Sequence, residues 1–493
     1  MKAALGIDFG TTNSTVCFFD GIVYHFADLE EGKRAIPSLM YVDRQFYPTY
    51  GELARTQFLN DNLDRRIKLE KTDLGYIEIT LSEGSFDAFE HSGADSVPIE
   101  AGIEANRRTS TFDAKITSFT DQQLPGFLFA GTKRLLGQAI MNSVKLFSKN
   151  IKLEAVVSSI IQNIQSKVKK EYSHVETPYI FVGRPVNYEC AFEDKQGECN
   201  ELAVARMDKA LEYAGIRQHD YFLEPIAPVL AYFHEHDEEE NQNVLVLDFG
   251  GGTLDFSIIE KRKKRLQVVG SFGRTLGGDI INEILMKDYI LPRMGLSRNN
   301  ILELRRRHNS LGEIIPDIVN WRTTYILNQP KYFILIAKAM KLLPQEAQNL
   351  NRIRLLITRN YGYNAYCAVE AAKKRLSDSL QADIELERIG ISFTLTRRDF
   401  EKSMQNYLVA VESSIKNLCM DNEYQTGQIE RVLLTGGTSL IPCINKRIQS
   451  LFPGKVVEID PFFSTVKGFA FGAWLHGQNK ISLNGDRFEI DIK

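Results

Sequence analysis

Two stretches of the sequence place an aspartate and small residues directly after an apolar run. Residues 4–19 read ALGIDFGTTNSTVCFF and residues 244–259 read VLVLDFGGGTLDFSII, with Asp8 and Asp248 in equivalent positions. The apolar runs are typical of strands buried on both faces of a sheet, and the residues after each turn predict a second strand. The sequence therefore contains the same strand–turn–strand motif twice.

These turns have the residue types that bind phosphate. Backbone N–H groups in a glycine turn form a concave site for anionic oxygens, and the hydroxyls of Thr11, Thr12 and Thr253 add donors. An aspartate can hold Mg²⁺ or its waters, because Mg²⁺ usually keeps several waters and takes one or two carboxylates. A single Asp-x-Gly turn more often has only a conformational role. Two copies, each flanked by buried strands, indicate two related domains that close on one nucleotide.

A third glycine turn follows another apolar run. Residues 431–442 read RVLLTGGTSLIP, which predicts a strand, the turn Gly436-Gly437-Thr438 and a helix that begins near Pro442. A helix N-terminus after two glycines is a possible anion or nucleotide site. Taken alone, this segment is better explained as a structural corner between a strand and a helix.

The elements between these turns alternate between helices and strands. Apolar spacing predicts helices over 153–172 and 200–216, with Gly215 as the cap of the second, and a strand within 174–186. This order predicts an α/β fold with a mixed sheet. We place the main domain boundary near residues 230–243, and stretches 61–125 and 297–364 read as insertions into a common core.

Composition narrows the classes of function. The net charge of −3 gives no electrostatic reason to expect nucleic acid or a membrane surface as a partner. Six cysteines without a CxxC pair argue against zinc and against a disulfide framework, so we expect reduced thiols. The N-terminus lacks a signal-peptide pattern, and no segment approaches the roughly 18 uncharged apolar residues of a membrane span. We expect a cytoplasmic protein.

In its motifs and their order, the chain resembles the ATPase domain of the seventy-kilodalton heat-shock chaperones, within the actin and sugar-kinase superfamily. The resemblance covers most of residues 3–475 outside the two insertions. Its specific segments are GIDFGTTNS (6–14), AGTKRLLGQ (130–138), LEPIAPVLAY (223–232), LDFGGGTLDFSI (247–258), LGGD (276–279), VEAAKKRLSDS (369–379) and LLTGGTSLIP (433–442). The chain is similar to short members of the family that consist of the nucleotide domain without the substrate-binding domain.

The resemblance implies a fold of two related actin-like, ribonuclease-H-like lobes. Each lobe would have a mixed β-sheet flanked by helices, with the nucleotide in the cleft between the lobes. Lobe I would cover 1–235 with an insertion at about 61–125, and lobe II would cover 236–475 with a helical insertion at about 297–364. Residues 476–493 would form a C-terminal tail, in which the Asn-Gly pair predicts a small hairpin.

The resemblance also implies roles for individual residues. Asp8 and Asp248 would hold the hydrated Mg²⁺, Lys133 would reach the γ-phosphate, and Glu224, Asp255 and Thr253 would complete the catalytic group. ATP or ADP would be bound by the first turn (Gly10, Thr11, Thr12, Asn13), the second turn (Gly250, Gly251, Gly252, Thr253) and the nucleoside contacts Gly277, Gly278, Glu370, Lys373, Lys374, Ser377, Gly436, Gly437, Thr438 and Leu440. The sequence leaves open whether Asp248, Asp255, Glu224 or none of them is the general base.

The chain departs from the family pattern at several positions. Gly183, followed by Arg184 and Pro185, replaces a proline that the family uses in signalling. Leu440 replaces an arginine that lies over the adenine, so a cation–π contribution is lost and nucleotide affinity is expected to be weaker or altered. The aspartate that the family has after Asn-Pro is absent from DPFFSTVKG (460–468), and the family's substrate-binding domain has no counterpart in the tail.

These observations predict a chaperone-like ATP-binding protein that slowly hydrolyses ATP with Mg²⁺ and switches conformation for a protein partner or client. Three alternatives stay open. The protein could be an actin-like filament or scaffold protein, a small-molecule kinase that uses the same phosphate turns, or a nucleotide sensor that does not hydrolyse ATP.

Overall fold

The computed structural model describes residues 3–65, 67–82, 109–139, 141–173, 175–177, 179–190, 195–236, 241–263, 265–457, 459–484 and 487–490. The chain forms two compact units. Unit 1 consists of Met1–Asp61, Pro125–Leu291 and Asn364–Lys493, and unit 2 consists of Asn62–Leu124 and Pro292–Tyr363. Every candidate site residue lies in unit 1. The predicted boundaries of the two lobes stay a prediction.

The first sheet of unit 1 contains the first Asp-Phe-Gly turn. Its path is β13–β12–β1–β2–β3, in which β1, β12 and β13 are parallel and β2 and β3 are antiparallel to their neighbours. A short strand, β4, also pairs with β2. The bounds are β1 Ala4–Phe9, β2 Asn13–Phe19, β3 Tyr24–Phe26, β4 Ala35–Pro37, β12 Ile180–Arg184 and β13 Asp220–Leu223.

The second sheet repeats this pattern around the second turn. Its path is β20–β19–β14–β15–β16–β22–β21, where β14, β19 and β20 are parallel and β15 and β16 continue as antiparallel hairpins. The bounds are β14 Asn241–Phe249, β15 Leu254–Arg262, β16 Arg265–Arg274, β19 Arg431–Thr435, β20 Val456–Val457, β21 Ile481–Asn484 and β22 Arg487–Ile490. Three parallel strands followed by an antiparallel hairpin thus occur twice, in the same order.

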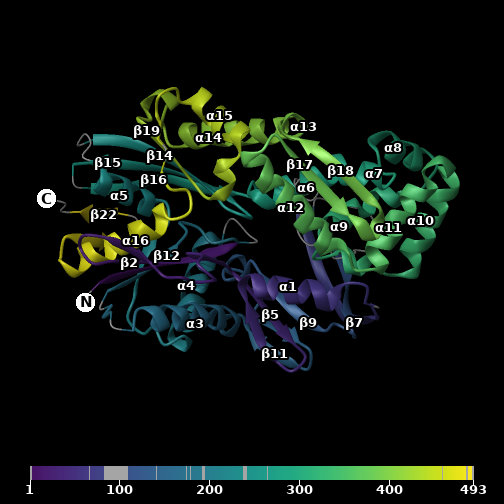
Figure 1. Ribbon diagram of the computed structural model, residues 1–493, viewed down its shortest axis with the longest axis horizontal. Coiled ribbons are helices and arrows are strands. Elements are labelled where there is room, and N and C mark those ends of the chain that lie inside the picture. The colour runs from purple at the N-terminus through teal and green to yellow at the C-terminus, as the bar shows by residue number, and fades with distance from the viewer. Residues whose placement is uncertain are drawn as a thin grey trace. The chain divides into compact units, whose positions relative to one another are not determined.

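Helices cover both faces of the first sheet. On one face lie α3 (Leu153–Glu171) and α4 (Gln196–Tyr213), whose apolar side chains share a core with the odd-numbered residues of β1 (Figure 1). Both helices were predicted, although α4 begins four residues earlier than expected. Gly215 follows α4 with a φ of 85°, a backbone conformation that favours glycine, as predicted for a helix cap.

Two helices fill the space between the two sheets. Helices α5 (Ile226–Glu235) and α16 (Ser464–Gly477) share one continuous apolar core with side chains from β2, β14 and β19. Their backbones approach closely: a methyl group added to Gly468 would lie only 2.0 Å from the carbonyl oxygen of Ala227. Each large apolar side chain buried here contributes about 1.5–3 kcal/mol, so this core holds the two sheets in a fixed relation.

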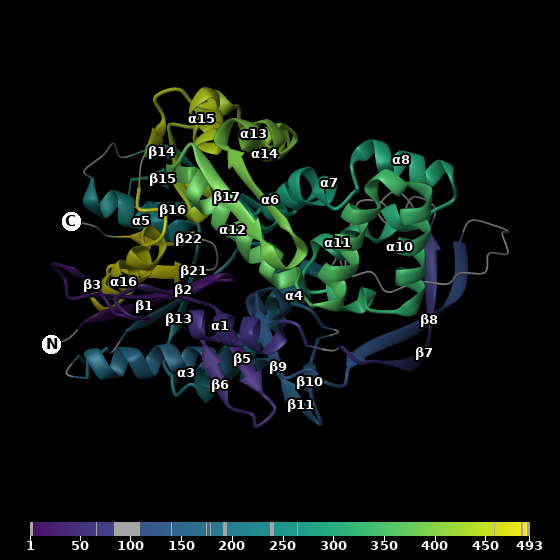
Figure 2. The ribbon, with the colours of Figure 1, turned by 45° about the vertical axis from the view of Figure 1, so that its right-hand side comes forward.

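Further elements of unit 1 surround the sheets. Figures 1 and 2 show helix α12 running beside strands β17 and β18. Helix α12 spans Gly362–Asp378 and is the helix predicted to bind adenosine. The other elements are β5 Leu39–Asp43, β6 Pro48–Tyr50, α1 Gly51–Asn62, β9 Gly126–Ala130, η1 Thr132–Leu135, β10 Ser143–Leu146, β11 Lys149–Lys152, α6 Gly278–Leu285, β17 Gln381–Leu386, β18 Ile391–Thr396, α13 Arg397–Ser403, α14 Gln405–Asp421 and α15 Pro442–Leu451.

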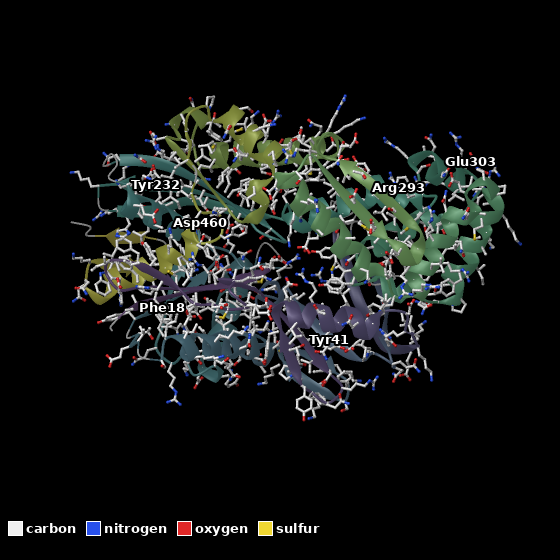
Figure 3. The ribbon with its side chains drawn as sticks, viewed as in Figure 1. Phe18, Tyr41, Tyr232, Arg293, Glu303 and Asp460 are labelled. Atoms are coloured by element: carbon white, nitrogen blue, oxygen red, sulfur yellow. A yellow bond between two sulfur atoms is a disulfide. The ribbon has the colours of Figure 1, made fainter. Side chains whose placement is uncertain are left out.

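Unit 2 combines a long two-stranded ribbon with a group of helices (Figure 2). Strands β7 (Leu69–Ser82) and β8 (Thr109–Asp121) pair antiparallel. The helices include α8 Arg298–Arg306, α9 Ile315–Val319, α10 Pro330–Leu342 and α11 Ala347–Thr358, which confirms the mainly helical character predicted for 297–364. An ion pair of 3.2 Å between Arg359 and Asp64 joins the two chain segments of this unit. Figure 3 labels Arg293 and Glu303, which also belong to it.

The C-terminal tail forms the expected hairpin and has a larger role than predicted. Strands β21 and β22 pair antiparallel, and β22 pairs with β16, so the tail adds two strands to the edge of the second sheet. The described residues of the basic run 260–265 lie at the end of β15 and the start of β16, which pair antiparallel, in agreement with the predicted hairpin. Among the described residues, no helix is both long enough and apolar enough to cross a bilayer.

Candidate nucleotide site

The two Asp-Phe-Gly motifs form tight turns between antiparallel strands, as predicted. Asp8 near the end of β1 pairs in register with Thr15 on β2, and Asp248 near the end of β14 pairs with Asp255 on β15. The strands on either side of each turn are mostly buried. Because each turn joins equivalent strands, the two turns lie at equivalent ends of the two sheets. The local pattern of the sequence is sufficient to fix this geometry.

The two turns meet each other. A methyl group on Gly251 would lie 1.8 Å from the hydroxyl oxygen of Thr12, so only a residue without a side chain allows this approach. The residues of both turns keep partial access to solvent, apart from Gly252, which is buried. The backbones of two glycine turns are therefore brought to one place, as a site that grips a polyphosphate from two sides requires.

The third glycine turn joins the second. Gly436 has a φ of 76°, a conformation that favours glycine, and a methyl group there would lie 3.0 Å from a carboxylate oxygen of Asp248. The hydroxyl of Thr438 donates to the carbonyl oxygen of Gly250 over 3.4 Å. At the start of α6, the backbone N–H groups of Gly278 and Asp279 donate to carbonyl oxygens of the second turn over 3.0 and 2.7 Å. The predicted contacts Gly277, Gly278, Gly436, Gly437 and Thr438 are thus assembled around it.

Helix α12 presents its predicted residues along one face. Lys373 is buried and its Nζ donates to the carbonyl oxygen of Gly278 over 2.9 Å. Burial lowers the pKa of Lys373 to about 8. Glu370 is also buried and pairs with Lys374 over 3.0 Å. Burial disfavours the charged form of Glu370, but Lys374 and Lys373 outweigh it and lower the pKa of Glu370. Ser377 follows one turn later, at the helical spacing of the same face.

A lysine and four carboxylates form the opposite, charged end of the site. Lys133, in η1, is buried and donates to Glu224, which stands just before α5. Burial raises the pKa of Asp8 and of Asp255 to about 7, and it also raises the pKa of Asp248. Burial opposes the charge of Lys133, but Glu224 and Asp8 outweigh this effect and raise its pKa.

The surroundings of this cluster leave room for solvent. A pocket at the carboxylates is lined by Pro185, Val186, Asn187, Glu224, Pro225, Val246, Asp248, Asp255, Ser257, Ser271, Phe272 and Gly273. The hydroxyl of Thr253 donates to Asp255 over 3.1 Å. The five predicted catalytic residues, Lys133, Glu224, Asp248, Thr253 and Asp255, are therefore neighbours.

The donor set fits a hydrated Mg²⁺ better than a metal enclosed by protein. Within the described ranges, no group of three or more His, Cys, Asp or Glu side chains is arranged to hold a metal directly. Mg²⁺ takes few protein carboxylates and keeps waters and phosphate oxygens as ligands. Burial raises the pKa values of Asp8, Asp248 and Asp255, and the neighbouring carboxylates add to this effect, so a divalent cation would stabilise their charged forms.

Several residues that the sequence analysis missed support the site. Ser38 braces the first turn, because its hydroxyl donates to Gly10 over 2.7 Å and its backbone N–H donates to Thr12 over 2.8 Å. Arg55 on α1 lies 3.6 Å from Glu370 on α12. Arg134, next to Lys133, pairs with Glu189. These contacts are long-range, and a single sequence carries no local signal for them.

The expectation that all cysteines are reduced is wrong for one pair. Cys190 and Cys199 form a disulfide with a Cα–Cα distance of 5.7 Å, and Cys17, Cys419 and Cys443 are free thiols. Cys190 lies after β12 and Cys199 lies in the first turn of α4, and their Cα atoms are within the range that a disulfide requires. Spacing alone gave no indication of this pairing. The disulfide directly follows Glu189, the partner of Arg134.

Comparison with known proteins identifies the family. The family model described as Hsp70 protein matches residues 132–312 and 349–473, which is more than half of the chain. The chain belongs to the Hsp70 family. This confirms the resemblance and, with it, the actin-like fold of two lobes, which agrees with the repeated sheet pattern.

The curated Hsp70 relatives are distant. A heat shock 70 kDa protein 2 of Paracoccidioides lutzii is 24% identical over 77% of this chain and 54% of its own length. A heat shock 70 kDa protein of Trichophyton rubrum is 22% identical over 96% of this chain and 57% of its own length. Chaperone protein DnaK 3 of Synechococcus is 24% identical over 97% of this chain and 58% of its own length. The chain thus spans a little over half the length of these relatives.

Proposed function

We propose that the protein binds ATP with Mg²⁺, hydrolyses it slowly to ADP and phosphate, and presents its nucleotide state to a protein partner. The observation that carries this proposal is the meeting of two Asp-Phe-Gly turns beside a buried lysine and a group of carboxylates. A nucleotide would be held with its phosphates between the turns and its nucleoside against α12, Gly278 and the third glycine turn.

Each group in the charged end has a chemical task in this proposal. Backbone N–H groups of the two turns would bind the phosphate oxygens, and Lys133 would turn from Glu224 toward the γ-phosphate. Asp8 and Asp248 are the residues that would hold the water shell of Mg²⁺, which supplies positive charge to neutralise the phosphates. Catalysis would rest on position and charge rather than on a covalent intermediate.

Among the carboxylates, Asp255 is the one we assign to the attacking water. Its pKa of about 7 suits a group that accepts a proton near neutral pH, and Thr253 fixes one of its oxygens through a 3.1 Å hydrogen bond. Asp248 is assigned to the metal, and Glu224 is assigned to hold Lys133 until the nucleotide binds. This choice among the three carboxylates is part of the proposal.

A conformational signal requires that a partner bind the ATP and ADP states with different affinity. The 3.6 Å pair between Arg55 on α1 and Glu370 on α12 joins two elements that both border the nucleoside region. A change in this distance with nucleotide would be the origin of the signal. A cytoplasmic location, a protein client and the lack of a nucleic-acid partner are parts of the same proposal.

Calorimetric titration with ATP, in Mg²⁺ and in excess EDTA, tests the binding step. We expect saturable binding that weakens at least about tenfold without Mg²⁺, since the carboxylates then repel the phosphates. Absence of binding in both conditions would overturn the proposal. Light scattering after ATP addition tests the filament alternative, and phosphate transfer to added sugars or polyols tests the kinase alternative. We expect no change in scattering and no transfer.

A further inference from the structure

Two large apolar side chains stand exposed at the edge of the nucleoside region. Leu440, at the end of the third glycine turn, is 47% exposed, and Phe462, in the loop before α16, is 46% exposed. A methyl group on Gly437 would lie 2.9 Å from Cε1 of Phe462. The phenyl ring therefore lies directly against the glycine turn.

The loop that carries Phe462 is fixed. The backbone N–H of Gly436 donates to the carbonyl oxygen of Pro461 over 2.7 Å, which joins the loop to the turn. The carboxylate of Asp460, labelled in Figure 3, accepts from the backbone N–H groups of Phe462 and Phe463 over 3.0 and 3.1 Å. The ring of Phe463 packs on Phe26 with centroids 5.0 Å apart. Phe462 is thus presented to solvent by an ordered segment, and a ligand that covers it would have little loop entropy to overcome.

This apolar edge borders groups that bind the rest of the nucleotide. Gly436, next to the turn residue that Phe462 touches, approaches the carboxylate of Asp248. Thr438, one residue further along, reaches Gly250 of the second phosphate turn and lies 3.0 Å from a methyl position on Gly278. An exposed aromatic ring beside polar nucleoside contacts is the arrangement that a flat, apolar ring system requires.

We infer that Phe462 stacks on the nucleotide base and is a specificity-determining residue of this site, with Leu440 completing the apolar edge. This inference rests on the proposed nucleotide site and adds to it the group that recognises the base. Stacking between a base and an aromatic side chain contributes to affinity without hydrogen bonds to the base. Stacking by Phe462 would take the place of the cation–π contact that an arginine at position 440 would supply.

Substitution of Phe462 tests the inference, with ATP and inorganic tripolyphosphate as the probes. Phe462→Ala should weaken ATP binding about tenfold or more, the effect expected for the loss of a stacked base, and leave tripolyphosphate binding unchanged. Phe462→Tyr, which keeps the ring, should bind ATP within about twofold of the wild type. Val409→Ala on α14, where the side chain is 54% exposed, is the matched control and should bind both probes as the wild type does.

A fluorescent variant gives a second readout that does not depend on affinity. In Phe462→Trp, ATP should quench the additional tryptophan emission relative to wild type, which has two tryptophans, and tripolyphosphate should not. Equal ATP affinity of Phe462→Ala and wild type, or no selective quenching, would overturn the inference while the nucleotide site stands. If the wild type binds neither ATP nor tripolyphosphate, the proposed function itself fails.

Discussion

Asp248 on β14 lies directly across the strand pair from Asp255 on β15. In the equivalent register of the first sheet, Asp8 lies across from Thr15. The two copies of the motif are therefore alike in backbone and different in charge. The second copy has two neighbouring carboxylates, and burial raises the pKa of Asp255 to about 7. In our proposal, proton transfer therefore belongs to the second sheet, while both copies of the motif contribute to phosphate and metal binding.

Removal of the buried lysine should separate binding from hydrolysis. We expect Lys133→Met to lower single-turnover hydrolysis about 10²–10³-fold, because the γ-phosphate loses its positively charged partner. Nucleotide affinity should change far less, since the two turns remain. Lys145→Met on β10, an exposed position, is the control and should leave both quantities unchanged. An equal loss of affinity and rate in Lys133→Met would contradict the assigned role.

The contact between the two turns can be tested with a single methyl group. Gly251→Ala places that group 1.8 Å from the Thr12 hydroxyl, so we expect loss of nucleotide binding with retained folding of unit 1. Gly197→Ala on α4 is the matched control, because nothing lies within 4 Å of its methyl position. It should bind normally and gain roughly 0.5–1 kcal/mol of stability from helix propensity. Circular dichroism and calorimetry measure the two properties, and normal ATP affinity in Gly251→Ala would refute the two-turn site.

The raised pKa of Asp255 predicts how stability depends on pH. Between about pH 4 and pH 7 the folded protein holds a proton on Asp255 that the unfolded chain has released, so stability falls as pH rises through this window. Asn at this position does not titrate. Denaturant unfolding of the nucleotide-free protein should therefore show Asp255→Asn gaining stability relative to wild type from pH 4.5 to pH 7.5. A constant difference between the two proteins across this range would contradict the raised pKa.

The disulfide between Cys190 and Cys199 should contribute to folding stability. It closes a short loop, for which the chain-entropy relation predicts about 2–3 kcal/mol. Cys190→Ser with Cys199→Ser should lower the midpoint of denaturation accordingly, and wild type in reductant should behave like the double variant. Cys443→Ser, which alters a free thiol outside this disulfide, serves as the comparison. Mass spectrometry that finds six free thiols under non-reducing conditions would rule out the disulfide.

The sequence predicts the parts of the site that depend on local pattern. Neighbouring residues encode the turns after β1 and β14, the glycine turn after β19 and the face of α12. Glycine after a buried strand is a strong local signal for a tight turn. The remaining parts depend on contacts between distant segments. Ser38 reaches Gly10, Arg134 reaches Glu189, and the hairpin of β21 and β22 pairs with β16, a strand far earlier in the chain. The spacing of residues within a short segment does not predict those contacts.

The central claim is that two Asp-Phe-Gly turns form a hydrolytic nucleotide site, and single-turnover cleavage of labelled ATP tests it most directly. The purified protein is mixed with substoichiometric ATP and Mg²⁺, without partner or acceptor, and bound nucleotide is separated over time. The account predicts that bound ATP becomes bound ADP with release of one phosphate, and that Asp248→Asn abolishes this conversion. ATP that stays bound and uncleaved over many hours would contradict the claim of hydrolysis.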